Sequence, residues 1–387
     1  MLRYDNYTEG NSFLDDLKPG LYIYSDEMLS RFSIFGGASI NKRGERDLFL
    51  QFTYNNGVPF FHEFFTRQLQ FVPQFSLEGY NVTRKTTADL IASVDTLGVG
   101  VEYNLLALDF SMAWKMFNVN HDFKFKYSVQ KYSSIISPFV IPQSGIFVRS
   151  SSDDYFKSNS LGLEYNFDYT YPTKNSDINP IGRKVKLKYD YEMSDINPEL
   201  EVTDDGRLIS KFQTNKLHKV EGEWLESFGL FNNEHSLSFK LYGGTVFGPP
   251  VDDFYNYYVS GLPGMKGYPF YSLGGGRAAS LNVTYRLPLL QNIDFRLSPV
   301  YFDKLYLSLY GDYGYAWNGS DVKLSDFKKD IGAQLRLQAF SFYVFPTSIF
   351  FDAAYGLDQF TREFRNEQVT YGKEWRFYFG VLFGFDI

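Results

Sequence analysis

WRFYFGVLFGFDI, the run of residues 375–387 that ends the chain, decides the fold class. Its odd positions, from Trp375 to Ile387, are all apolar, whereas its even positions are mostly small or polar. Successive side chains of a β-strand point to opposite faces, so this run predicts a strand with one wholly apolar face. A run of this length is also long enough to cross a lipid bilayer at a tilt.

The same alternation recurs earlier in the chain. Apolar or aromatic side chains take every second position, with polar or small ones between them, in residues 123–130, 184–191, 280–287 and 331–338. A soluble β-sandwich would alternate in the same way, but its strands average about 5–6 residues and the runs here are longer. Tyr and Phe also stay frequent near strand ends, where a membrane barrel places its aromatic girdle. The pattern therefore favours a transmembrane barrel.

The composition points to the same class. The 387 residues include 40 Phe, 31 Tyr and 4 Trp, so 19% of the chain is aromatic, yet 21% is charged and the mean hydropathy is −0.28. We find no apolar run of about 20 residues, which a membrane-spanning helix needs. Strands that alternate between lipid and a polar lumen reconcile many aromatic rings with low hydropathy. The absence of cysteine fits an oxidising envelope compartment, and the net charge of −7 argues against a nucleic-acid partner.

We therefore expect an all-β fold: a transmembrane antiparallel β-barrel of about 16 strands with both termini in the periplasm. The expected strands are 30–40, 47–55, 58–68, 82–93, 96–105, 107–117, 121–132, 157–171, 182–194, 213–229, 235–248, 276–289, 304–317, 328–340, 348–358 and 374–387. An even count is usual for a single-chain bacterial barrel. The long connections 133–156, 195–212, 249–275 and 359–373 then all fall on the outer side.

The first residues of the chain have a different character. Residues 1–29 are polar and predict a short periplasmic lead-in, so residues 30–387 form the single barrel domain. Met1-Leu2-Arg3 continues directly into polar residues without the apolar stretch of an export signal, which indicates a mature or trimmed chain. Residues 19–61 resemble the start of the barrel in envelope proteins that carry a periplasmic β-propeller, and this resemblance implies a missing upstream domain.

The connection 249–275 carries the most specific motif of the chain. Within the run GLPGMKGYP it reads Gly264-Met265-Lys266-Gly267-Tyr268, and five predicted strands follow it. The strand 304–317 carries Tyr310-Gly311-Asp312-Tyr313-Gly314. Over about residues 255–387 this order resembles the barrel of the BamA/TamA/FhaC superfamily, also called the bacterial surface antigen family.

The resemblance implies a specific contact. In this family a loop motif of hydrophobic–Arg–Gly–aromatic type folds into the lumen, and its arginine contacts an acidic residue in an aromatic-x-Asp-x-Gly strand motif. Met265 to Tyr268 match the loop motif, and Tyr310, Asp312 and Gly314 match the strand motif. Asp312 also has the parity of the inward side chains of its predicted strand, and a carboxylate in the lumen favours a cation. We therefore expect a Lys266–Asp312 pair, although lysine cannot make the planar fork of arginine.

The C-terminus matches an insertion signal of outer-membrane proteins. Tyr378, Gly380, Phe383 and Phe385 have the polar-x-Gly-x-x-apolar-x-apolar spacing, with two residues left over after it. Any last strand of a barrel would read in a similar way, so the match has an ordinary structural explanation as well.

The sequence suggests no catalytic or metal-binding site. The histidines are His62, His121, His218 and His235, and none has the spacing of a metal ligand set. The three glycines at 274–276 are followed by a predicted strand and not by a helix, so they do not form a phosphate loop. We expect no enzyme activity and no cofactor.

The predicted function is the handling of polypeptides, or of a lipid-linked cargo, during insertion or export at the outer membrane. The alternatives are a passive, porin-like channel or receptor gated by its infolded loop, and a membrane anchor for a missing periplasmic domain. The expected partners are outer-membrane lipid, client polypeptides and periplasmic accessory proteins, with no nucleic acid, and the barrel is expected to be monomeric. The fold analogy carries most of this step, and a fold alone does not fix a function.

Overall fold

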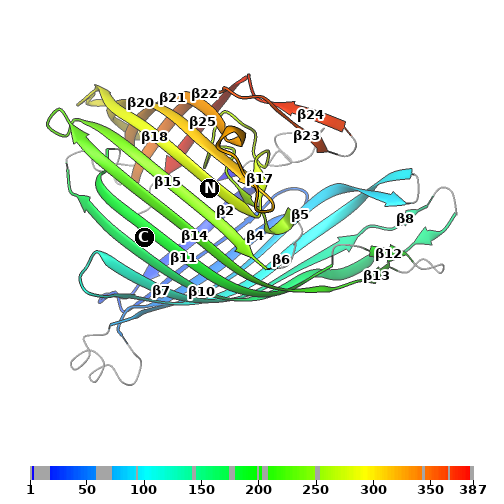
Figure 1. The fold of residues 1–387 in the computed structure, drawn as a ribbon. Coiled ribbons are helices and arrows are strands. Elements are labelled where there is room, and N and C mark those ends of the chain that lie inside the picture. The colour runs from blue at the N-terminus through cyan, green and yellow to red at the C-terminus, as the bar shows by residue number, and fades with distance from the viewer. Residues whose placement is uncertain are drawn as a thin grey trace. The chain divides into compact units, whose positions relative to one another are not determined.

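The computed structural model describes residues 2–3, 18–57, 72–92, 95–141, 145–173, 179–197, 200–202, 208–248, 253–341, 345–364 and 367–383. Regular structure in these residues is almost entirely β (Figure 1), with two short 3-10 turns at Asp253–Tyr255 and Leu324–Asp326. The all-β class predicted from the sequence is confirmed. None of the described helices has the length and apolar character that crossing a membrane requires.

The chain forms two compact units. Unit 1 comprises residues 1–164, 189–218 and 248–250, and unit 2 comprises 165–188, 219–247 and 251–387. Counted over the described residues, 17 strands belong to one large sheet, in agreement with the expectation of about 16. Three long strands contribute residues to both units: β10 (Ser151–Tyr171), β11 (Ile181–Ile196) and β14 (Gln213–Leu230).

Unit 1 is built on antiparallel pairing of strands that follow each other in the sequence. They are β1 (Leu2–Arg3), β2 (Lys18–Asp26), β3 (Phe32–Ile40), β4 (Arg46–Tyr54), β5 (Gln74–Ala92), β6 (Asp95–Lys115) and β7 (His121–Ile136). Two small hairpins extend the connections: β8 with β9 (Phe139–Val140, Phe147–Val148) and β12 with β13 (Leu200–Val202, Leu208–Ser210).

Unit 2 continues the same pairing rule and carries the candidate site. Its strands are β15 (His235–Phe247), β18 (Arg277–Leu290), β19 (Phe295–Leu297), β20 (Val300–Trp317), β21 (Lys328–Ser341), β22 (Phe345–Gly356) and β25 (Trp375–Phe383). Short pairs in the connections are β16 with β17 (Tyr257–Tyr258, Gly274–Gly275) and β23 with β24 (Phe360–Phe364, Glu367–Tyr371).

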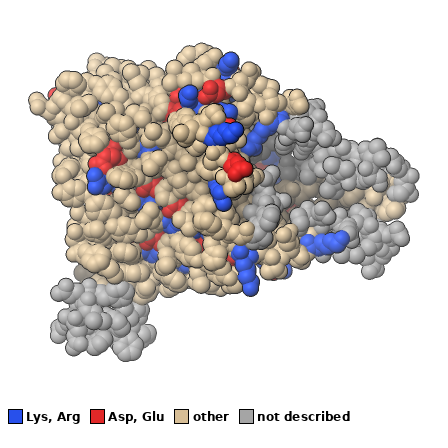
Figure 2. Space-filling model, in the orientation of Figure 1, with Lys and Arg blue, Asp and Glu red and all other residues tan. Residues whose placement is uncertain are grey.

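The predicted alternation of side chains is present in these strands. On β20, Tyr306, Ser308 and Asp312 are buried, whereas Leu309 is 47% exposed. On β25, Phe379 is 73% exposed. We call the face that carries the buried set the inner face. In the view of Figure 2, side chains other than Lys, Arg, Asp and Glu predominate. The exposed set is apolar in these strands, as contact with lipid requires.

The sheet begins earlier than predicted. Part of the expected lead-in forms β2, which pairs with β3 so that Tyr22 lies opposite Gly37. The division of the chain at residue 30 was therefore wrong for residues 18–26. The segment has only a short alternation of apolar residues, and polar and turn-forming residues flank it on both sides, so the sequence pattern did not indicate a strand. Leu21 and Ile23 of this segment are strongly exposed.

The structure joins two of the predicted strands into one. The segments 96–105 and 107–117 were expected to be separate strands, but they form the single strand β6, which pairs through Ala107 with both Tyr80 and Gln130. The adjacent residues Leu105 and Leu106 interrupt the alternation of apolar and polar side chains. The backbone stays extended there because the neighbouring strands β5 and β7 both pair with it. The predicted strand 58–68 lies outside the described residues.

Candidate functional site

The connection from β15 to β18 folds back on itself. We call its described residues 253–276 the infolded loop. Within it Tyr257 pairs with Gly275, and the Met265 N–H donates to the Val259 carbonyl at 2.7 Å. The Gly261 N–H donates to the Met265 carbonyl at 3.0 Å, and this hydrogen bond closes a tight turn that includes Gly264. These backbone bonds hold the loop motif in a fixed shape.

An apolar cluster fastens the infolded loop to the inner face of β18 and β20. Met265 and Tyr268 are almost completely buried, at 1% and 0% exposure. The cluster comprises Val259, Met265, Tyr268, Leu273, Ala278 and Ala316. Burying an apolar side chain the size of Val259, Met265 or Leu273 is worth roughly 1.5–3 kcal/mol, so packing contributes a large part of the free energy of loop docking. The expectation that the late loop lies against the inner face is confirmed.

Lys266 makes the charged contact of the loop motif. Its Nζ lies 2.6 Å from Asp352 Oδ2 and 4.2 Å from the centre of the Tyr310 ring. Asp352, on β22, is fully buried, and it also accepts hydrogen bonds from the Tyr310 hydroxyl and, at 2.9 Å, from Gln334 Nε2. The buried carboxylate therefore has one cation and two neutral donors, as a charge removed from water requires.

The predicted Lys266–Asp312 pair was wrong in its acidic partner. Asp312 faces inward as expected and is attracted electrostatically by Lys266, but its carboxylate accepts a hydrogen bond from a neighbouring strand. Asn282 Nδ2 donates to Asp312 Oδ1 at 2.5 Å, and the carboxyl groups of Asp312 and Asp330 interact electrostatically. Asn282 and Asp330 lie directly opposite Asp312 on β18 and β21.

The backbone of the loop motif has a second acidic partner. The Gly267 N–H donates to Asp330 Oδ2 at 2.6 Å. A side chain at this position would not fit, because a Cβ on Gly267 would lie 2.6 Å from the Asp330 Cβ and 2.7 Å from the Gly356 nitrogen. Gly314 is constrained as well, since its added Cβ would lie 2.8 Å from the Ser280 Cβ of the neighbouring strand and 3.0 Å from Met265 Sδ of the loop. Glycine at 267 and 314 thus permits the close approach of loop and wall.

Aromatic hydroxyls complete the anchoring. The Tyr268 hydroxyl lies 2.8 Å from the Lys329 carbonyl and 3.0 Å from the Asp358 carbonyl, and it accepts from the Asp358 N–H. Burial raises the pKa of the Tyr268 hydroxyl, so the group remains a neutral donor. Tyr378 of β25 donates to the Lys266 carbonyl at 2.8 Å. A residue predicted as part of an insertion signal therefore also contacts the loop.

The rest of the predicted C-terminal signal is described only in part. Gly380 pairs with Phe350 on the neighbouring strand, and the backbone of Phe383 pairs with Thr347. Phe385 lies outside the described residues. These positions have the spacing of an insertion signal, and their role in insertion stays a prediction.

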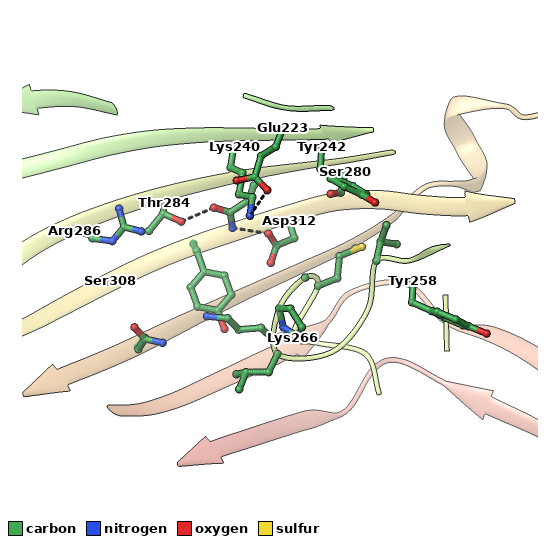
Figure 3. A pocket seen from close by; sticks show the side chains of 18 residues that line it. Glu223, Lys240, Tyr242, Tyr258, Lys266, Ser280, Thr284, Arg286, Ser308 and Asp312 are labelled. Carbon is green, nitrogen blue, oxygen red and sulfur yellow. Dashed lines mark hydrogen bonds and ion pairs between the residues drawn. The ribbon is translucent and has the colours of Figure 1, made fainter. Parts of the chain in front are cut away.

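A polar cavity of about 420 Å³ lies beside the loop motif (Figure 3). Lys266, Tyr310 and Asp312 line it, together with residues that sequence reasoning did not select, among them Asn282 and Arg286. Sequence reasoning also missed two aspartates of the anchor, Asp330 and Asp352. The alternation of their predicted strands was the available signal, because both aspartates lie at the same parity as the polar and small residues of those strands.

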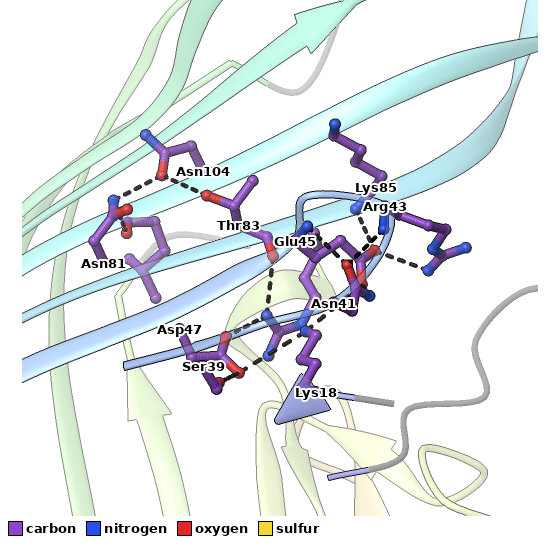
Figure 4. A network of polar contacts seen from close by, with 12 residues as sticks. Lys18, Ser39, Asn41, Arg43, Glu45, Asp47, Asn81, Thr83, Lys85 and Asn104 are labelled. Atoms are coloured by element: carbon purple, nitrogen blue, oxygen red, sulfur yellow. Dashed lines mark hydrogen bonds and ion pairs between the residues drawn. The ribbon is translucent and has the colours of Figure 1, made fainter. Parts of the chain in front are cut away.

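A separate polar network lies in unit 1 (Figure 4). Lys18 Nζ is 3.6 Å from Glu45 Oε2, and Arg84 pairs with Asp47. Burial alone would raise the pKa of the Glu45 carboxyl, but the Lys85 N–H, the side chain of Asn41 and nearby cations outweigh it and hold this pKa below its ordinary value of 4.5. The network fastens the β3–β4 turn to β5, because the Lys85 N–H of β5 donates to Glu45 Oε1 at 2.7 Å.

The fold and the site together define a class: a transmembrane antiparallel β-barrel with an infolded loop. No protein-family model and no curated protein matches the chain. Among solved structures, CdiB from Escherichia coli is similar, with a TM-score of 0.52 at 13% identity over 95% of this chain and 59% of that chain. CdiB from Acinetobacter baumannii gives 0.49 at 12% identity, over 94% and 56%. The chain thus spans less than two thirds of either protein, and the likeness to the Escherichia coli protein shows the fold.

Proposed function

We propose that this chain is the barrel of a protein-export or protein-insertion system in a bacterial outer membrane. The observation that carries the proposal is the infolded loop, held on the inner face by the Lys266–Asp352 ion pair at 2.6 Å. A backbone hydrogen bond from Gly267 to Asp330 and the buried Tyr268 fix the same loop. The fold shared with Escherichia coli CdiB supports the same reading, as does the resemblance of the loop and strand motifs to the BamA/TamA/FhaC superfamily.

The mechanism that we propose is mechanical and needs no covalent chemistry. The docked loop occupies part of the lumen, and a client polypeptide passes or inserts when loop and wall change their contacts. Hydrogen bonds to charged groups contribute about 1.5–3 kcal/mol each, so the contacts of Lys266 and Gly267 hold the loop firmly but reversibly. The proposed partners are outer-membrane lipid, client polypeptides and periplasmic accessory proteins, with both chain termini on the periplasmic side.

Depletion of the intact gene product tests the proposal. Outer-membrane proteins and exported proteins would be quantified by mass spectrometry as the protein is depleted, with re-expression of the wild-type gene as the control. A joint fall of many barrels supports an insertase, and a fall of one or a few surface or secreted proteins supports a dedicated exporter. If no protein falls while the uptake of small solutes changes, the export proposal is wrong and the channel alternative replaces it.

A further inference from the structure

Arg286 on the inner face of β18 is an unusual cation. It lines the polar cavity of about 420 Å³, and its Nη1 donates to Ser238 Oγ at 3.0 Å. In the described part of the chain, no carboxylate lies within ion-pair distance of its guanidinium. The other two cations of the cavity differ in this respect, because Lys240 pairs with Glu223 at 3.0 Å and Lys266 with Asp352 at 2.6 Å.

A second guanidinium adds to the positive charge at this place. Arg336 on β21 repels Arg286 electrostatically, and its Nη2 donates to Ser348 Oγ at 3.1 Å. Strand β20 runs between the two, with Ser308 directly opposite Arg286 and Tyr306 directly opposite Arg336. A cation that is partly removed from water, as Arg286 is, is costly unless an anion compensates it.

The donors at Arg286 match one kind of ligand. A guanidinium presents its N–H groups in a planar fork that fits the oxygens of phosphate. Ser308 faces the same cavity, and its hydroxyl makes no side-chain hydrogen bond within the described residues. We propose that Arg286, assisted by Ser308, binds an oxyanion of the phosphate class: a free phosphate or the phosphate monoester of a larger molecule. This inference is independent of the export function.

The size and charge of the cavity agree with such a ligand. Its charged lining comprises the cations Lys240, Lys266 and Arg286 and the acids Glu223 and Asp312, hence three against two. Both acids are already engaged, Glu223 by Lys240 and Asp312 by Asn282. A volume of about 420 Å³ falls in the range of about 300–1,000 Å³ that holds small organic ligands, so the cavity has room for a phosphate and the group that carries it.

Titration calorimetry on the full chain in detergent tests the site. The probes are inorganic phosphate and dihexanoyl phosphatidate, a short-chain lipid with a phosphate monoester. Arg286→Gln should weaken binding by about tenfold or more, because it removes a charge-assisted pair, and Arg286→Lys should lie between it and the wild type. The matched control is Arg183→Gln, since Arg183 is exposed and already paired with Glu226 at 2.6 Å.

The outcomes separate the sources of the ligand. Equal binding of both probes supports a free ion as the ligand, and tighter binding of the phosphatidate supports a lipid headgroup. Heat-modifiable migration in gels confirms that each variant is folded, and Arg286→Lys provides a second variant should the glutamine form not fold. The proposal is overturned if the wild type binds neither probe, or if folded Arg286 variants bind both probes as tightly as the Arg183→Gln control.

Discussion

Replacing Asp352 by alanine should release the loop motif from the wall of the sheet. The substitution removes the partner of Lys266 Nζ at 2.6 Å and leaves the Tyr310 hydroxyl and Gln334 Nε2 without their acceptor. Removing one member of a buried ion pair costs about 3–5 kcal/mol. The Lys266 side chain is 19% exposed, so its ammonium group can regain some water, and we expect a loss near the lower end of that range.

Hydrogen exchange of the loop peptide measures this loss directly. The Gly267 N–H is protected by its bond to Asp330, and it exchanges with solvent only when the loop opens. If opening is an equilibrium that precedes exchange, a loss of about 3 kcal/mol speeds exchange about a hundredfold. Mass spectrometry of peptides covering residues 261–270 would record this change in detergent or in liposomes.

The control is another ion-paired aspartate of unit 2. Asp303→Ala breaks the Asp303–Lys304 pair at 3.3 Å, which does not involve the loop, so exchange in residues 261–270 should stay at the wild-type rate. Unchanged exchange in Asp352→Ala would refute the reasoning. If exchange is faster in Asp312→Ala and unchanged in Asp352→Ala, the result would instead support Asp312, the partner of Lys266 that the motif resemblance implied.

Three further substitutions test other parts of the fold. Gly314→Ala should lower the free energy of unfolding by about 1–3 kcal/mol, because its Cβ would press on the Ser280 Cβ and on Met265 Sδ. The control Gly311→Ala, whose Cβ meets nothing closer than 3.6 Å, should be near neutral in urea titration. Phe379→Arg on the exposed face should cost about 2–4 kcal/mol near the bilayer midplane, measured by unfolding in liposomes against Phe379→Leu. The pKa of Glu45 is lowered, so its contacts stabilise the fold above pH 4.5 and lose this effect as the pH falls through the lowered value. In Glu45→Gln the free energy of unfolding should therefore fall less steeply at acid pH. The same dependence of this free energy on pH in both proteins would contradict the assignment.

The sequence predicts the faces of strands better than their ends. Period-two alternation follows from backbone geometry alone, and the exposed Phe379 and the buried Tyr306 lie on the faces that it assigns. Strand ends depend on pairing, which a single strand does not encode. At Leu105-Leu106 two adjacent apolar residues interrupt the alternation, yet β5 and β7 pair across this point and keep the backbone extended.

The anchor shows the same limit at the level of one contact. Alternation places Asp312 and Asp352 on the inward face, so both were available to Lys266. The choice between them depends on the register of neighbouring strands: Asn282 lies opposite Asp312 and engages its carboxylate. A motif resemblance indicates which residue types contact the loop. It does not identify Asp352, 86 positions after Lys266 in the sequence, because tertiary packing decides which carboxylate the lysine reaches.

Lysine at position 266 fits this carboxylate in a way that arginine would not. Lys266 is a compact point charge and contacts Asp352 Oδ2, while the Tyr310 hydroxyl bonds Oδ1. A guanidinium that forms a bidentate pair contacts both oxygens, so it would compete with the Tyr310 hydroxyl for the space beside Oδ1. We therefore expect Lys266→Arg to speed hydrogen exchange in residues 261–270, and Lys266→Arg combined with Tyr310→Phe to restore slow exchange. If Lys266→Arg alone protects the loop as well as lysine does, the two donors do not compete for this carboxylate.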